Sequence, residues 1–115
     1  MKKQFFVLFS FSVLFLSLGC TQQPSKQANS LALEEQAMLE CKKLCNSVLD
    51  SAADLSKGPC LENPMQGFPD YACDIAHNPR QAVDGLPENQ CSAFAGGKAG
   101  HFVELDTECK LIKIA

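Results

Sequence analysis

The sequence predicts a small α+β domain, in which one long N-terminal helix packs on a C-terminal antiparallel sheet. Before residue 56, apolar residues recur at three- and four-residue steps, the period of an amphipathic helix. Near the C-terminus, short runs alternate apolar and polar residues, which is the period of strands. Six cysteines are spread over both parts, and we expect them to join the helix to the rest of the domain by disulfides.

Residues 1–19 are typical of a signal peptide rather than of a folded element. Lys2 and Lys3 precede an apolar run from Phe5 to Leu18, which suits the hydrophobic region of such a peptide. As a helix this run would cover only ~21 Å, less than the ~30 Å hydrocarbon core of a bilayer. We therefore predict a cleaved signal peptide and not a permanent membrane span.

The segment Leu16-Ser17-Leu18-Gly19-Cys20 resembles the lipobox of prokaryotic lipoproteins. The resemblance implies that the Cys20 thiol receives a diacylglyceryl group and that Cys20 becomes the N-terminus after cleavage. The usual lipobox has leucine three places before the cysteine, where this chain has Ser17. The resemblance covers residues 1–20 only and implies nothing about the fold. The alternative is an ordinary secreted protein in which Cys20 has no special role.

The number of cysteines supports lipidation by a separate route. The chain has seven cysteines, and an odd number leaves one thiol over in an exported protein. Lipidation of Cys20 would leave six for three disulfides: Cys41, Cys45, Cys60, Cys73, Cys91 and Cys109. We therefore expect an extracytoplasmic protein that is anchored to a membrane by lipid, with acyl chains such as palmitate on Cys20.

The charge of the mature chain limits its partners. Loss of Lys2 and Lys3 leaves 10 − 2 = 8 basic residues against 13 acidic ones, so the net charge is 8 − 13 = −5. Nucleic acids and anionic membrane surfaces both require clustered lysine and arginine. We therefore expect no nucleic-acid partner and attachment through the lipid alone. Residues 20–30 are polar and are predicted to be a flexible tether, which leaves residues 31–115 as one small domain.

The first element of this domain is a predicted helix over residues 31–56. Its apolar stripe includes Cys41 and Cys45, and Gly58-Pro59 is expected to end it. Two cysteines one helical turn apart point the same way, which disfavours a bond between them. Each is therefore expected to bond outside the helix. The sequence does not choose among the remaining pairings.

The stretch from Pro59 to Glu88 is rich in proline and glycine, and we predict a long irregular segment with one helical turn at Tyr71–His77. A loop of this length is uncommon in a compact domain unless something orders it. Cys60 and Cys73 are expected to clip it to the rest of the domain.

Three strands are predicted in the C-terminal part of the chain. Residues 91–94 and 101–105 flank Gly96-Gly97 and are expected to form a hairpin, and residues 110–114 follow a turn at 106–108. The apolar residues expected to lie under the helix are Phe94, Val103, Leu105, Leu111 and Ile112.

Two classes of function remain open. The first is a non-enzymatic interaction module of the cell envelope, with exposed Phe68 and Tyr71 on the clipped loop as binding residues for another envelope macromolecule. The second is a small metal-binding protein or enzyme that uses Asp70, Asp74, His77 and His101. Isolated cysteines in an exported chain favour disulfides over zinc, so neither a metal nor another cofactor is predicted. The first class is favoured.

Overall fold

The computed structural model describes Gly19 and residues 26–115. The predicted signal peptide up to residue 18, the lipidation of Cys20 and the first half of the predicted tether lie outside the described residues. One long helix precedes four strands, which are α1 (Lys26–Asp50), β1 (Cys60–Glu62), β2 (Tyr71–Ile75), β3 (His101–Leu105) and β4 (Leu111–Ile114). Three short helices lie between β2 and β3, namely η1 (Ala82–Gly85), η2 (Pro87–Asn89) and α2 (Ser92–Ala95).

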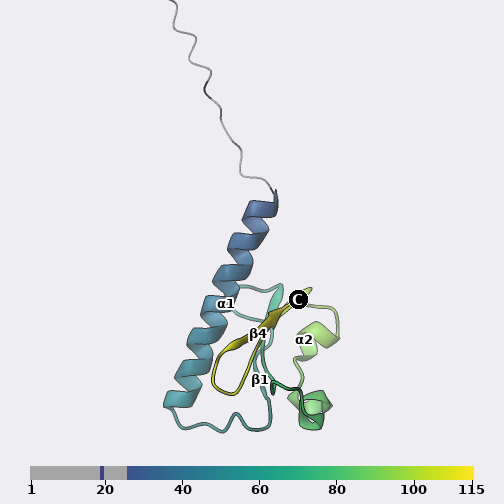
Figure 1. The fold of residues 1–115 in the computed structure, drawn as a ribbon. Helices are drawn as coiled ribbons and strands as arrows, with labels where there is room; N and C mark the ends of the chain where they lie inside the picture. The colour runs from purple at the N-terminus through teal and green to yellow at the C-terminus, as the bar shows by residue number, and fades with distance from the viewer. Residues whose placement is uncertain (1–18, 20–25) are drawn as a thin grey trace, which may run out of the picture.

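The α+β class is confirmed, because α1 packs against a four-stranded sheet (Figure 1). The strand order is β1-β2-β3-β4. The two outer pairs are antiparallel, but β2 and β3 are parallel, with Tyr71 opposite His101 and Ile75 opposite Leu105. The sheet is therefore mixed, and the prediction of an antiparallel sheet is wrong at its centre.

The predicted hairpin at Gly96-Gly97 is also wrong, because the segment before these glycines is the short helix α2. Parallel neighbours cannot be joined by a tight turn and need a crossover of a dozen or more residues. Residues 76–100 supply it, and we call them the crossover connection. It carries η1, η2 and α2 and lies on the other side of the sheet from α1 (Figure 1).

Helix α1 begins earlier than predicted, at Lys26, and ends earlier, at Asp50. Gly58-Pro59 does not end it. Ala52 has a left-handed backbone (φ 59°), its N–H bonds to the Leu49 carbonyl at 2.9 Å, and the N–H of Ala53 bonds to the Val48 carbonyl at 3.2 Å. This is the Schellman pattern, which glycine usually makes. Because an alanine takes this place, the sequence carries no glycine to mark the end of the helix. Within residues 26–115, no helix has the length and apolar character needed to cross a membrane.

The middle segment is more regular than predicted, because it contains β1 and β2. The helical turn predicted at Tyr71–His77 is wrong, since Tyr71–Ile75 is a strand with four of its five residues buried. A central strand that is covered on both faces need not alternate apolar and polar residues. The run Tyr-Ala-Cys-Asp-Ile therefore lacked the period that identifies a half-exposed strand.

All six cysteines within the described domain form disulfides, in the pairs Cys41–Cys73, Cys45–Cys109 and Cys60–Cys91. The prediction that Cys41 and Cys45 bond outside the helix is confirmed. Cys41 reaches the central strand β2, and Cys45 reaches the turn before β4. Two successive turns of α1 are thus fixed to different parts of the sheet layer.

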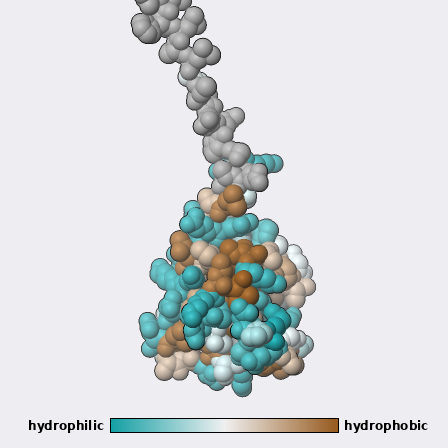
Figure 2. Space-filling view, viewed as in Figure 1, coloured by the Kyte–Doolittle hydropathy of each residue, from teal (hydrophilic) through white to brown (hydrophobic). Residues whose placement is uncertain are grey.

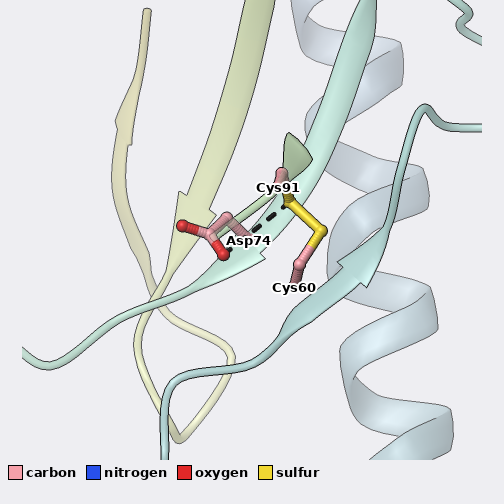
Figure 3. Close-up of side chains that lie close together, drawn as sticks. All are labelled: Cys60, Asp74 and Cys91. Carbon is pink, nitrogen blue, oxygen red and sulfur yellow. Dashed lines mark hydrogen bonds between the residues drawn. A yellow bond between two sulfur atoms is a disulfide. The ribbon is translucent and has the colours of Figure 1, made fainter. Parts of the chain in front are cut away.

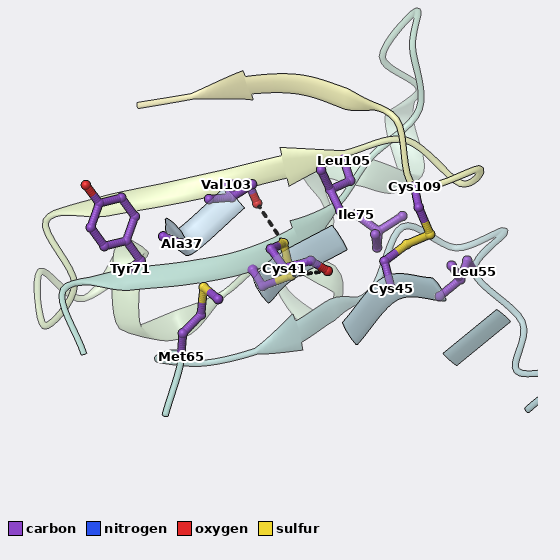
Figure 4. Packing of buried hydrophobic residues seen from close by; sticks show 11 residues of the cluster. Ala37, Cys41, Cys45, Leu55, Met65, Tyr71, Ile75, Val103, Leu105 and Cys109 are labelled. Carbon is purple, nitrogen blue, oxygen red and sulfur yellow. Dashed lines mark hydrogen bonds between the residues drawn. A yellow bond between two sulfur atoms is a disulfide. The ribbon is translucent and has the colours of Figure 1, made fainter. Parts of the chain in front are cut away.

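These two disulfides lie inside the hydrophobic core (Figure 4). Among the residues expected under the helix, Val103 and Leu105 are completely buried in this core. Phe94 and Leu111 are instead exposed by 40% and 41%, because one belongs to α2 and the other begins an edge strand. Ile114, at the end of β4, packs on the core.

We expect the core disulfides to contribute more to stability than Cys60–Cys91. Changing both Cys41 and Cys73 to alanine should lower the free energy of unfolding by about 2–5 kcal/mol in urea titrations. Changing Cys60 and Cys91 to alanine is a matched control, because the sequence separations are nearly equal at 32 and 31 residues. The control should lower the free energy of unfolding by less, since Cys60 is only half-buried and neither Cys60 nor Cys91 belongs to the core cluster that contains Cys41 and Cys73. Equal losses would contradict the distinction.

Candidate functional site

The face of the sheet that points away from α1 carries charged side chains. Side chains alternate along a strand, and Val103 and its partner Ile114 pack toward α1. The opposite face therefore carries Asp74 of β2, Glu104 of β3 and Lys113 of β4, which lie in register across the three strands.

A cavity of about 250 Å³ lies between this face and the crossover connection. We call it the sheet cavity. The sheet contributes Asp74, Phe102, Glu104 and Lys113 to its lining. The crossover connection contributes Arg80, Gln90, Cys91, Phe94 and Ala95. The cavity thus combines two carboxyl groups, two cationic groups, two aromatic rings and one sulfur of the Cys60–Cys91 disulfide.

The carboxylate of Glu104 is buried but paired. Its side chain is 6% exposed, and Arg80 Nη1 donates to Glu104 Oε2 at 2.9 Å. A buried charge without a partner would be costly, and this pair offsets part of that cost. The hydrogen bond to Glu104 also raises the pKa of the Arg80 guanidinium. Arg80 Nη2 also donates to the Asp84 carbonyl at 3.4 Å, within the crossover connection. The bond to Glu104 ties this connection to β3.

Asp74 has a different environment, because its carboxyl group faces a disulfide. Asp74 Oδ1 lies 3.8 Å from Cys91 Sγ (Figure 3). Burial, together with the negative charge of Glu104, raises the pKa of Asp74 to about 7, and Arg80 only partly opposes this shift. A disulfide sulfur carries no proton, so a hydrogen bond across this contact requires the proton to be on the carboxyl group. With a pKa of about 7, Asp74 holds a proton in roughly half of the molecules at neutral pH.

An aromatic pair forms the apolar part of the cavity wall. The rings of Phe94 and Phe102 meet edge to face with their centroids 4.6 Å apart. Lys113 Nζ lies 5.1 Å from the Phe102 centroid, in cation–π contact. Phe94, which the sequence placed under the helix, thus contributes to the opposite side of the sheet.

The four residues proposed for a metal or enzymatic site do not come together. Asp70 and His101 lie at the start of β2 and β3, where Asp70 Oδ2 is 3.7 Å from His101 Nε2. His77 lies beyond the other end of β2 and contacts Asp84, not Asp74. The helical step that would have joined Asp74 to His77 is absent because this segment is a strand.

Asp84 is a buried residue that the sequence analysis missed. Its carboxylate accepts hydrogen bonds from the backbone N–H groups of His77 and Gln81, at 3.0 and 2.8 Å, and contacts His77 Nδ1 at 2.8 Å. Burial alone would raise the pKa of Asp84, but these hydrogen bonds outweigh it and lower the pKa. The carboxylate fixes the start of the crossover connection. Its partners lie only three and seven residues away in the chain, and the Gln81-x-x-Asp84 spacing of a capping box is the local signal that could have identified it.

The predicted binding residues Phe68 and Tyr71 differ in exposure. Tyr71 is 3% exposed and stacks on His101 with the ring centroids 5.0 Å apart, so the expectation that it is exposed is wrong. Phe68 is half-buried and lines a shallow groove of about 540 Å³ beside α1, together with Leu44 and Met65. The groove has no buried charge, whereas the sheet cavity does.

Three donor atoms in and beside the wall of the sheet cavity have the spacing of metal ligands. Atoms of Cys60, Asp74 and Cys91 lie within 4.8 Å of one another. Metals bind thiolates, and these two sulfurs are bonded to each other, so the oxidised form offers only the carboxylate.

Comparison with protein-family models, curated proteins and solved structures found no match.

Titration of Asp74 should make stability depend on pH. Its folded pKa of about 7 lies above the ordinary value of ~3.9. Between these values the folded state binds more protons than the unfolded state, so this carboxyl group lowers stability as pH rises through that window. The melting temperature of Asp74→Asn should accordingly fall less between about pH 5 and about pH 8 than that of the wild type. Glu88→Gln, at an exposed site outside the cavity, should keep the wild-type profile. Equal profiles for wild type and Asp74→Asn would contradict the raised pKa.

Proposed function

We propose that this chain is a lipid-anchored, extracytoplasmic binding protein of the cell envelope, attached to a membrane through Cys20. The carrying observation is that the described domain pairs all six of its cysteines, which leaves Cys20 as the odd one among the seven in the sequence. Structural disulfides form and persist in oxidising compartments outside the cytoplasm. The position of Cys20 at the end of a signal-like segment supports its use as the anchor.

The start of α1 would lie close to the membrane in this arrangement. Six residue steps separate Cys20 from Lys26, and they can span at most ~22 Å. Among the residues of α1 whose burial the structure describes, the first buried one is Ala37, which is about 16 Å further along the helix axis than Lys26. Leu31 and Leu33 are exposed between these points, and Figure 2 shows apolar surface at this end of the domain. The first turns of α1 would thus separate the sheet from the lipid.

The sheet cavity is the best candidate for the binding site. Its walls are preorganised, because the Cys60–Cys91 disulfide and the Arg80–Glu104 pair fix the crossover connection to the sheet. A fixed wall loses little entropy when a partner binds. The aromatic pair and Lys113 suit a group with an apolar part and a hydrogen-bonding or anionic part. Phe94 is 40% exposed and is therefore accessible to an incoming partner.

The anchor can be tested by metabolic labelling with radioactive palmitate. The wild type should take up label and sediment with membranes, whereas Cys20→Ala should remain unlabelled and uncleaved, because the thiol that accepts the lipid is absent. The variant with Cys60 and Cys91 changed to alanine controls for acylation of other cysteines and should keep the label. Label on Cys20→Ala, or release of the wild type into the medium, would contradict the anchor.

The binding site can be tested by photo-crosslinking in intact cells. A photoreactive phenylalanine at position 94 should give a discrete adduct with an envelope component, because this ring borders the sheet cavity. The same group at Leu49 is the matched control, since Leu49 is similarly exposed at 38% but lies on α1. Lys113→Glu should reduce the adduct at position 94 by reversing a charge in the cavity. Equal adducts at both positions, or none at position 94, would exclude the cavity as the binding site.

A further inference from the structure

The Cys60–Cys91 disulfide differs from the other two in its surroundings. Cys41, Cys45 and Cys73 are completely buried, and Cys109 is 4% exposed. Cys60 is only half-buried and belongs to β1, a strand at the edge of the sheet. Its partner Cys91 is buried and lines the sheet cavity. Access to a disulfide governs its exchange with external thiols, so this bond is the accessible one of the three.

We propose that the Cys60–Cys91 disulfide exchanges with a thiol of a partner, and that Asp74 donates the proton to the departing Cys91 sulfur. This activity goes beyond non-covalent binding, and it does not depend on the lipid anchor. It assigns a catalytic residue, Asp74, to the wall of the sheet cavity and a modification site to Cys60, which is bonded to Cys91 of that wall.

The step balances in atoms and electrons. A partner thiolate attacks Cys60 Sγ and forms a new sulfur–sulfur bond, while the Cys60–Cys91 bond breaks. The electron pair of the broken bond goes to Cys91 Sγ, which takes the proton of the Asp74 carboxyl group. The products are a mixed disulfide at Cys60, a free Cys91 thiol and an Asp74 carboxylate. Attack by Cys91 on the mixed disulfide, with the proton returning to Asp74, releases the partner and restores the starting state.

The surroundings of Cys91 explain why a proton donor is needed. The Cys73 carbonyl oxygen lies 3.5 Å from Cys91 Sγ, and the Asp74 carboxyl oxygen lies 3.8 Å away. A thiolate at this buried position would face these two oxygen atoms and would be unfavourable. Protonation as the bond breaks avoids that species. Asp74 is the titratable group in contact with the sulfur, so it can supply the proton directly.

The charges around Asp74 keep this proton available near neutral pH. Burial, followed by the negative charge of Glu104 on the neighbouring strand β3, raises the pKa of Asp74 to about 7, and Asp84 of the crossover connection acts in the same direction. Arg80 acts in the opposite direction. Lys113 of β4 completes the charged groups around this part of the sheet cavity. An ordinary aspartic acid, with a pKa of ~3.9, would hold almost no proton at this pH.

Opening this disulfide leaves the framework of the domain in place. Cys41–Cys73 and Cys45–Cys109 still join α1 to the sheet layer. Strand β1 still pairs with β2 through backbone hydrogen bonds. The reaction therefore changes the wall of the sheet cavity and breaks no disulfide of the core cluster under α1.

The test treats the full chain with reduced glutathione, quenches with acid, alkylates the free thiols and maps each cysteine by mass spectrometry. We expect Cys60–Cys91 to open at the lowest glutathione concentration, with glutathione on Cys60 and the alkyl group on Cys91. The other two disulfides should remain closed. Earlier opening of another disulfide, or glutathione on Cys91 in place of Cys60, would overturn the proposal.

The role of Asp74 is tested by the rate of opening per glutathione thiolate. Asp74→Asn should lower this rate by about tenfold or more at pH near 6, as expected for loss of a general acid. The wild-type rate should fall as pH rises through ~7, where Asp74 loses its proton, whereas the Asp74→Asn rate should not. Glu88→Gln should match the wild type.

A second variant separates proton donation from a structural effect. Glu104→Gln removes a negative charge that raises the Asp74 pKa, so it should move the midpoint of the pH profile to lower pH. A wild-type rate and profile in Asp74→Asn would overturn the assignment of Asp74. An unmoved profile in Glu104→Gln would overturn it as well.

Discussion

The fold depends on two disulfides that join successive turns of helix α1 to the sheet layer. Cys41 bonds to Cys73 at the centre of the sheet, and Cys45 bonds to Cys109 in the turn before β4. One bond would fix the distance between helix and sheet, but two also fix the rotation of the helix about its axis. The core around them is small, with Met65, Ile75, Val103 and Leu105 as its largest completely buried apolar residues. A core of this size gains a large share of its stability from covalent constraints.

Because α1 occupies one face of the sheet, the other face must be covered by something else. The parallel pairing of β2 and β3 provides the cover, since a crossover connection has to pass over the sheet to join them. The connection brings Arg80 to the buried Glu104 and places Cys91 beside Asp74. The sheet cavity is thus a consequence of the topology. The charged residues of the strands face the crossover connection, and the irregular path of that connection leaves the cavity between them.

The sequence predicted the helix and the use of its cysteines because both depend on local geometry. A stripe that contains Cys41 and Cys45 shows the buried face directly, whereas strand pairing depends on contacts between distant segments. Tyr71–Ile75 had no alternation because it is a central strand, and Gly96-Gly97 suggested a hairpin where the chain makes a crossover. The sheet cavity could be predicted only in part. Asp74 was a candidate, but its partners Glu104, Arg80 and Cys91 are brought near only by the parallel register.

The contact between Asp74 and Cys91 links two chemical states. While the disulfide is intact, only a protonated carboxyl group can donate a hydrogen bond to the sulfur, so oxidation favours the neutral form of Asp74. In the exchange proposed above, the Cys91 thiol becomes the donor and the carboxylate becomes the acceptor. The charged groups that line the cavity then change from one negative and two positive charges to two of each. The coupling is reciprocal, so a partner that prefers one charge state of the cavity also favours either the closed or the open form of the Cys60–Cys91 disulfide. The core disulfides take no part in this change, which lets the cavity change its chemistry while α1 and the sheet stay fixed.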